Sequence, residues 1–351
     1  MNSWRDNVRK VEPYTPGEQP KEEGVIKLNT NENPYPPSEK IKEAMSGIKN
    51  LRKYPDPAAT KLVEAIASYH GFDKEEVFVG VGSDDVLAVA FMTFFNGKKP
   101  IFFPDITYSF YPVWAELFGI PYEKKAVNDV FEIQKEDYYA ENGGVVFPNP
   151  NAPTGTFLSL EVVEDIIQHN QDVVVIVDEA YIDFGGDTAK ELTRKYDNVL
   201  VVQTYSKSRS LAGLRIGYAI GNKELIKAMN DVKYSYNSYT MNEPSIVLGT
   251  AVLEDEEYFQ ETRNKIIDTR EWFQIEMRKI GFSFADSKAN FIFATHESVP
   301  AKEIFEAAKK AKIYVRYFDQ PRINNYLRIT IGTREEMETL LDFLKEFTAT
   351  K

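Results

Sequence analysis

The sequence of 351 residues contains no cysteine. Disulfide bonds, cysteine-ligated zinc sites and cysteine nucleophiles are therefore excluded, and this composition fits a cytoplasmic protein. Only three histidines occur, none in a metal-ligand spacing, so the sequence predicts no metal site. Long apolar runs are also missing. The run at residues 86–95 is far shorter than the roughly 20 residues that a membrane-spanning helix needs.

Positive charge is in deficit as well. Lysine and arginine total 42 against 54 acidic residues, which gives a formal net charge of −12. Such a balance argues against nucleic acid and anionic membrane surfaces as partners. A small anionic substrate would need a local basic site, so the few arginines near sequence motifs become the important ones.

The most informative stretch is residues 204–217, TYSKSRSLAGLRIG, which follows the apolar run 199–202. We interpret that run as a buried strand of a parallel sheet. Lys207 lies at the strand's end, where α/β sheets place their ligand sites, and is a candidate nucleophile for a carbonyl group. Arg215 supplies a planar fork that suits phosphate. Taken alone, the stretch also fits a polar surface loop.

A second apolar run, residues 173–177, ends in Asp178, and the sequence continues Glu-Ala-Tyr to Tyr181. A carboxylate at the tip of a buried strand is costly unless a cation meets it, and the protonated ring nitrogen of pyridoxal phosphate is such a cation. The alternative is that Asp178 caps the next turn. A third stretch, FPNPNAPTG at residues 147–155, has a tightly fixed backbone in which Asn151 could donate to a phenolate oxygen or simply belong to a turn.

The order of these motifs is more specific than any one of them. Asn-Pro-Asn-x-Pro-Thr-Gly, then Asp-Glu-Ala-Tyr, Ser-Lys and Arg resembles the fold-type I pyridoxal-phosphate aminotransferases of the aspartate aminotransferase superfamily. Within class II, the chain is most similar to the histidinol-phosphate aminotransferases. The resemblance implies transamination of L-histidinol phosphate with 2-oxoglutarate, giving imidazole-acetol phosphate and glutamate in histidine biosynthesis.

Other functions share much of this pattern. A threonine-phosphate decarboxylase or an aromatic amino-acid transaminase would carry nearly the same motifs, and a non-catalytic regulator could bind the same cofactor. A dehydrogenase is disfavoured, because the glycines at 80 and 82 do not continue into the dinucleotide-binding fingerprint.

The resemblance also implies roles for single residues. Lys207 would bind the aldehyde of pyridoxal phosphate, and Asp178 would pair with the ring nitrogen. Tyr108 would stack on the ring, while Asn151 and Tyr181 would hydrogen-bond its phenolate oxygen.

The same resemblance implies two further sets of residues, one for the cofactor phosphate and one for the substrate. The cofactor phosphate would be bound by Ser83, Asp84, Thr204, Ser206 and Arg215, together with Tyr54 from the second subunit of a homodimer. The expected substrate contacts are Tyr14, Asn33, Arg328 and Arg322. Arg328 would bind a carboxylate of the amino donor, and Tyr14 would lie on an arm that folds over the site.

The chain as a whole predicts an α/β fold. Apolar runs alternate with helical patterns between residues 77 and 220, which indicates a mostly parallel sheet flanked by helices. We expect an extended N-terminal arm and a helix in residues 1–50 that join the smaller domain. A large cofactor-binding domain would span residues 51–255, and a small α+β domain residues 256–351, with a long helix near 258–280 between them.

Overall fold

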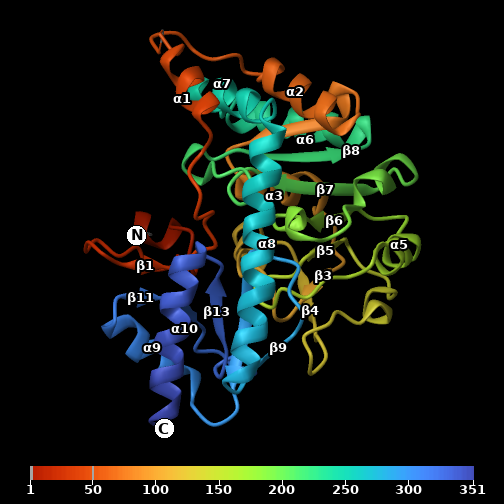
Figure 1. Cartoon of the computed structure of the whole chain (residues 1–351). Helices are drawn as coiled ribbons and strands as arrows, with labels where there is room; N and C mark the ends of the chain where they lie inside the picture. Colours follow the sequence, from red (N-terminus) through yellow and green to blue (C-terminus); the bar gives the residue numbers. More distant parts are fainter. Residues whose placement is uncertain (1–2, 50) are drawn as a thin grey trace.

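The computed structural model describes residues 3–49 and 51–351. Its largest element is a seven-stranded sheet (Figure 1). Strand β8 pairs antiparallel with both of its neighbours, β2 and β7, and the other neighbours are parallel, so the expected mostly parallel sheet is confirmed. In spatial order the strands are β2 (Val77–Gly80), β8 (Gly217–Gly221), β7 (Val199–Thr204), β6 (Val175–Asp178), β5 (Val145–Pro148), β3 (Ile101–Pro104) and β4 (Tyr122–Lys125).

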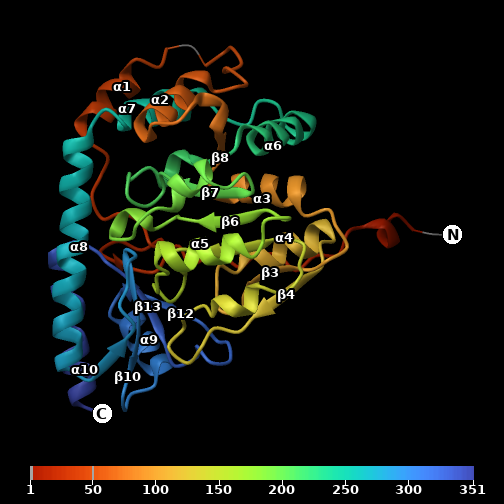
Figure 2. The ribbon, with the colours of Figure 1, turned by 90° about the vertical axis from the view of Figure 1, so that its right-hand side faces the viewer.

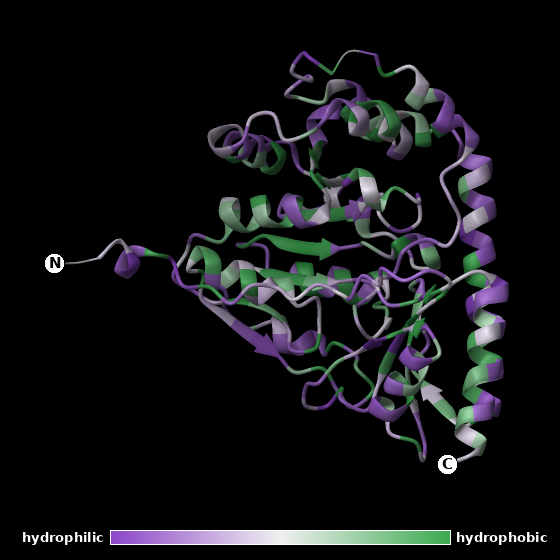
Figure 3. Cartoon of the chain, turned by 90° about the vertical axis from the view of Figure 1, so that its left-hand side faces the viewer, coloured by the Kyte–Doolittle hydropathy of each residue, from purple (hydrophilic) through white to green (hydrophobic). Residues whose placement is uncertain are grey.

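Both faces of this sheet are buried at every strand except the edge strand β4, which explains why those strands are continuous apolar runs. Ile176 packs on one face, whereas Val175 and Val177 pack on the other. The Ile176 face is covered by α3 (Ser83–Phe94), α4 (Phe110–Phe118) and α6 (Lys223–Tyr236), and the opposite face by α5 (Leu160–Gln168). The green strands at the centre of Figure 3 show the same apolar core.

A second sheet of four antiparallel strands lies near the C-terminus. Its order is β12 (Arg316–Tyr317), β13 (Leu327–Thr330), β10 (Phe291–His296) and β9 (Phe282–Phe284), and it is accompanied by α9 (Ala301–Lys310) and α10 (Arg334–Ala349). Residues 313–318 do not form a single strand. The chain breaks at Val315, so β11 (Ile313–Tyr314) pairs instead with β1 (Ile26–Lys27) in a separate two-stranded sheet.

One long helix, α8 (Glu256–Lys279), runs beside both sheets (Figures 1 and 2). From its middle, the buried Arg270 donates from Nη1 to the carbonyl oxygens of Phe184 and Ala289, at 2.8 and 2.9 Å. Phe184 follows the large sheet's strand β6, and Ala289 precedes β10 of the small sheet. A single side chain therefore bonds to both units.

The N-terminal region divides between the two units. Strand β1 pairs with the small unit's β11, but helix α1 (Glu39–Ser46) packs against α7 (Glu243–Val252). Its one buried residue, Ile41, belongs to the same apolar cluster as residues of α2 (Thr60–His70). The expectation that this helix joins the smaller unit is therefore wrong. Ahead of β1, the chain projects outward as an extended arm (Figure 2).

Several shorter pieces complete the described residues. They are 3₁₀ helices at Trp4–Asn7, Lys74–Glu76, Lys135–Tyr138, Ile182–Phe184, Ala189–Arg194 and Ala212–Leu214. Across residues 3–49 and 51–351, no helix combines the length and the apolar character that crossing a membrane requires.

Candidate active site

A cavity of about 280 Å³ lies at the carboxyl ends of three parallel strands. Pro148, Asp178 and Thr204, the last residues of β5, β6 and β7, all line it. Parallel strands bring their ends to one edge of the sheet, so residues far apart in sequence meet there. The structure brings together these residues singled out from the sequence: Tyr14, Ser83, Asp84, Tyr108, Asp178, Tyr181, Thr204, Ser206, Lys207, Arg215 and Arg328.

Asp178 is a buried carboxylate, 4% exposed. Its Oδ2 accepts a hydrogen bond from the Tyr111 hydroxyl at 2.9 Å, and its Oδ1 accepts one from the Ala180 backbone N–H at 3.2 Å. Within the described part of the chain, no lysine, arginine or histidine forms an ion pair with it. Burial consequently raises the pKa of Asp178 to about 6. A cationic group entering the cavity would supply the missing partner.

The opposite wall begins with the first turn of helix α3. Its free backbone N–H groups and helix dipole favour an anion, and Ser83 and Asp84 occupy that turn. Gly82 precedes them with φ of +85°, and a Cβ there would lie 2.5 Å from Nη2 of Arg215. A Cβ on Gly217 would lie 2.2 Å from the Ser83 nitrogen. Glycine at both positions therefore lets the chain close into a cup around the first turn of α3.

Side chains around this cup hold one another. Arg215 donates from Nη2 to Oδ2 of Asp84 at 2.9 Å, and the Tyr108 hydroxyl donates to Oδ1 of the same carboxylate at 2.7 Å. Burial and the Asp84 charge raise the pKa of Tyr108 well above its usual value, so its hydroxyl stays protonated. The Thr204 hydroxyl donates to Ser206 Oγ and accepts from the Ser206 backbone N–H, which fixes the loop just before Lys207.

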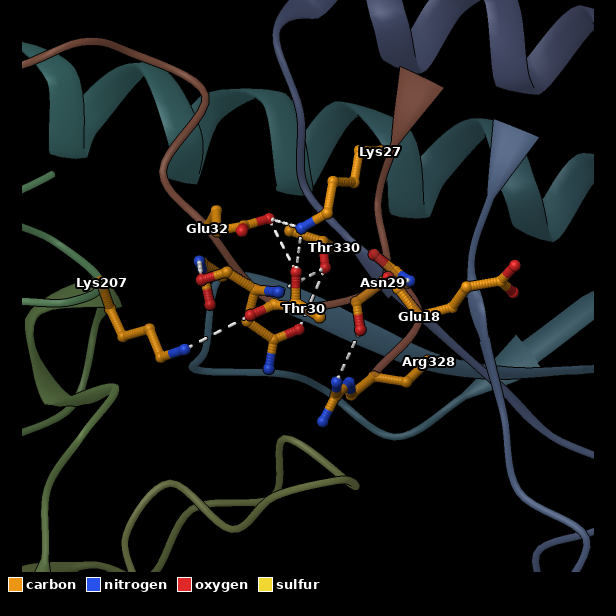
Figure 4. A network of polar contacts seen from close by, with 10 residues as sticks. Glu18, Lys27, Asn29, Thr30, Glu32, Lys207, Arg328 and Thr330 are labelled. Atoms are coloured by element: carbon orange, nitrogen blue, oxygen red, sulfur yellow. Dashed lines mark hydrogen bonds and ion pairs between the residues drawn. The ribbon is translucent and has the colours of Figure 1, made fainter. Parts of the chain in front are cut away.

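Lys207 contacts the N-terminal arm rather than a carboxylate. Its Nζ donates to the backbone carbonyl of Thr30 at 3.4 Å (Figure 4). The same nitrogen lies 5.6 Å from the centre of the Tyr181 ring. A long hydrogen bond of this kind is weak, so the amine can be redirected into the cavity at small cost. Glu32 is nearby but is already bonded to Lys27 and Thr30.

Two arginines from the small sheet line the same cavity. Arg316 on β12 lies opposite Arg328 on β13 in the antiparallel register. Arg328 donates from Nη2 to the carbonyl oxygen of Asn29 at 2.9 Å, but its buried Nε has no partner. Burial lowers the pKa of Arg328, and the nearby charge of Arg316 lowers it further. Neither arginine forms an ion pair among residues 3–49 and 51–351, so the pair presents uncompensated positive charge.

The structure does not bring four of the expected residues to this cavity. Asn151 accepts from the Thr107 hydroxyl and donates to the carbonyl oxygen of Ile106, so its amide ties its loop to the segment that follows β3, and the neighbouring Ala152 faces the cavity. Asn33 donates to the carbonyl oxygen of Ser208.

Arg322 and Tyr54 also lie elsewhere. Arg322 is bonded to Asp105 at 2.8 Å and to the carbonyl oxygen of Val127 at 2.7 Å, so it links the small unit to the large one instead of lining the site. Tyr54 is 82% exposed and packs beside Tyr239, 4.7 Å between ring centres. Its expected role needs a second subunit, and that prediction stays open.

Two parts of the site are not predicted by the sequence. Arg316 is the first, as one member of the arginine pair. It could have been found only from its position opposite Arg328, which requires the register of the two strands to be known. The sequence assigns no contact to residues 29–31 of the expected arm, yet all three line the cavity.

The donor set fits pyridoxal phosphate. A buried acid lacking a cation, an anion cup at a helix N-terminus and a weakly held lysine surround one space. These match the cofactor's ring nitrogen, phosphate and aldehyde in turn.

Comparisons with known proteins show which proteins this chain is similar to. The family model described as aminotransferase class I and II matches residues 23–344. The histidinol-phosphate aminotransferase of Lactococcus lactis subsp. lactis (strain IL1403) is 50% identical over 347 residues, which cover 98% of this chain and 96% of that protein. The structure of the histidinol-phosphate aminotransferase from Clostridium acetobutylicum superposes with a TM-score of 0.85 at 22% identity, over 93% of this chain and 100% of that chain. The Sinorhizobium meliloti histidinol-phosphate aminotransferase in complex with pyridoxal-5′-phosphate gives a TM-score of 0.84 at 21% identity, over 93% and 91%.

Proposed function

Because this chain belongs to the class I and II aminotransferases, and within them to the histidinol-phosphate aminotransferase family, we infer that it transfers an amino group between L-histidinol phosphate and 2-oxoglutarate. The products are imidazole-acetol phosphate and glutamate, and the reaction belongs to histidine biosynthesis. Pyridoxal phosphate is the cofactor. When bound, it supplies an electron sink that acidifies the α-carbon of the amino donor.

The residues proposed to hold the cofactor come from four segments. Asp178 would pair with the protonated ring nitrogen and thereby gain the cation that it lacks in the protein alone. The first turn of α3 and Arg215 would bind the phosphate, with Thr204 and Ser206 as further donors. Tyr108 would pack on the ring, since its hydroxyl is anchored to Asp84 at the rim of the cup.

Lys207 is proposed as the residue that carries out proton transfer. At rest its Nζ would hold the aldehyde carbon of the cofactor. Once the incoming amine releases it, the same nitrogen would take a proton from the donor's α-carbon and return it at the cofactor. The long hydrogen bond to the carbonyl oxygen of Thr30 suits this exchange, because the bond that Lys207 gives up there is weak.

The single observation that carries the substrate assignment is the pair Arg316 and Arg328. L-histidinol phosphate has a phosphate ester in the place of an α-carboxylate, and 2-oxoglutarate has two carboxylates. Arg328 has an unpartnered Nε, and Arg316 makes only 3.5 Å contacts with the carbonyl oxygens of Thr15 and Pro16, so both guanidinium forks can bind either group bidentately. The overall charge of −12 makes such a local basic site necessary for any anionic substrate.

Two further proposals concern the assembly of the protein and its location in the cell. We propose a cytoplasmic homodimer in which Tyr54 of one subunit reaches the cofactor phosphate of the other. Its high exposure supports this, because a tyrosine this open is available for an interface.

The test is a half-reaction followed by absorbance. Purified protein with pyridoxal phosphate should show a visible band that L-histidinol phosphate removes, whereas phenylalanine and threonine phosphate should act at least about 100-fold less efficiently, since they lack either the phosphate or the imidazole. Release of carbon dioxide from threonine phosphate would instead indicate a decarboxylase.

Substitution of the lysine gives a matched control. Lys207→Ala should abolish turnover and the visible band, whereas Lys310→Ala, on the exposed face of α9, should change neither. A protein that stays colourless with added cofactor, or a Lys207→Ala variant that still turns over, contradicts the assignment.

A further inference from the structure

The hydroxyl of Tyr181 is bonded on one side to a residue for which the proposed reaction assigns no role. Asn31 donates from Nδ2 to the Tyr181 oxygen at 2.9 Å. Asn31 is 1% exposed and has φ of 59°, the left-handed region that asparagine tolerates better than most residues. Its backbone carbonyl accepts from Asn290 Nδ2 at 3.0 Å, so both its backbone and its side chain are held.

The direction of each hydrogen bond around Asn31 is fixed by its neighbour. The Asn31 backbone N–H donates to Thr330 Oγ1 at 3.0 Å, so this oxygen already accepts one proton. The Thr330 hydroxyl in turn donates its own proton to Oδ1 of Asn31, also at 3.0 Å. With Oδ1 occupied by a donor, the Asn31 amide must present its N–H₂ side to Tyr181.

The consequence concerns the proton of Tyr181. Because its oxygen accepts from Asn31, its hydroxyl hydrogen is left to donate elsewhere, and Tyr181 lines the cavity. Asn151, the other residue expected at the cofactor's phenolic oxygen, is committed to Thr107 and Ile106. Tyr181 is thus the donor that remains for that oxygen.

We propose that Asn31 is a positioning residue that directs the Tyr181 hydroxyl proton to the phenolic oxygen of pyridoxal phosphate, and that Thr330 sets its orientation. This inference rests on the proposed function. Thr330 is two residues from Arg328 on strand β13, and Arg328 bonds to Asn29 on the same arm segment. One strand of the small unit therefore both presents the substrate-binding arginine and orders the cofactor's hydrogen bond.

The test changes the orientation without adding charge. In Thr330→Val, Oδ1 of Asn31 loses its donor, so the amide can turn and accept the proton of Tyr181, which then no longer reaches the cofactor. A donor to the phenolic oxygen stabilises the ionised form, so its loss should raise the pH midpoint of the holoenzyme's visible absorbance by about half a unit or more. The dissociation constant of the cofactor should rise about tenfold or more, as for one lost hydrogen bond to a charged oxygen.

Matched variants separate positioning from general damage. Thr330→Ser keeps the hydroxyl and should leave the midpoint unchanged. In a Tyr181→Phe background, Thr330→Val should cause no further shift, because the hydroxyl through which it acts is gone. The charged and titratable groups near Tyr181, which are Lys207, Arg328, Tyr14, Tyr108 and Tyr111, are the same in all these proteins.

If Thr330→Val does not fold, the pH midpoint is measured on Asn31→Gly instead, because glycine accepts the left-handed backbone and removes the side-chain amide. An equal shift in Thr330→Ser, or a shift that persists in the Tyr181→Phe background, overturns the inference. A wild-type protein without a visible cofactor band would instead count against the proposed function itself.

Discussion

Asp178 should make the cofactor-free protein less stable as the pH rises from about 4 to 6. Its carboxyl is buried and has no cationic partner, so its pKa rises from 3.8 to about 6. Below the ordinary pKa the group is protonated in both the folded and the unfolded chain and contributes no penalty. Between the two values the unfolded chain ionises while the folded one resists. The stability present at low pH is therefore lost as the pH passes through the folded value.

The size of this loss follows from the displacement of the pKa. A rise of about two pH units corresponds to about 3 kcal/mol of unfolding free energy. Asp178→Asn is neutral at every pH and should lack this dependence. We therefore expect the difference in unfolding free energy between the variant and the wild type to grow by about 2.5 kcal/mol in the variant's favour between pH 4 and pH 7.

Urea denaturation of cofactor-free protein, followed by tryptophan fluorescence at several pH values, measures this difference. Glu179 is also buried, and its pKa is raised to about 7, but both proteins carry it and its contribution cancels. Tyr111→Phe removes a donor that favours ionised Asp178, so in that background the loss should extend to higher pH. Pyridoxal phosphate should stabilise the wild type at pH 7 much more than Asp178→Asn.

A difference between the two proteins that does not change with pH would refute this reasoning. It would mean that water or a protein cation reaches Asp178 in the empty cavity. The proposed pairing with the ring nitrogen would then lose its physical basis, because a satisfied carboxylate gains little from a new cation.

Three further predictions concern arginines. Arg316→Lys keeps a charge but loses the bidentate fork, so kcat/KM for L-histidinol phosphate should fall about 10-fold or more, measured by steady-state kinetics. Arg322→Gln should change kcat/KM less than about threefold but lower the unfolding free energy by about 0.5–1 kcal/mol, because its partner Asp105 lies outside the cavity lining and the pair is partly exposed; a large rise in KM would restore it as a substrate contact. Arg270→Met leaves two buried carbonyl oxygens unpaired and should lower the unfolding free energy by about 2–4 kcal/mol in urea denaturation without changing the KM for either substrate.

The sequence by itself determined the large sheet and the residues at its strand ends. Asp178 and Lys207 follow apolar runs whose two faces are both buried, and parallel strands must deliver such residues to one edge. The order of the motifs along the chain indicated the family, because the reaction needs an acid, a lysine and an arginine. These inferences use only local pattern and chain order.

Tertiary structure alone decided the rest of the site. Asn151 and Ala152 are neighbours in one loop, and the contacts of Asn151 with Thr107 and Ile106, more than 40 positions away, determine which of the two faces the cavity. Arg316 lines the cavity and Arg322 does not. The reason is that the extended segment is interrupted at Val315, which sets the register of β12 against β13.

Residues 29–31 of the N-terminal arm show most clearly what the sequence alone cannot predict. Residues 29–31 carry no regular periodicity, yet their carbonyl and amide groups contact Lys207, Arg328 and Tyr181. Side chains in a strand alternate by a fixed period, so their direction can be read from sequence. In a loop, direction depends on which distant partners satisfy its polar groups, and the folded chain alone supplies those partners.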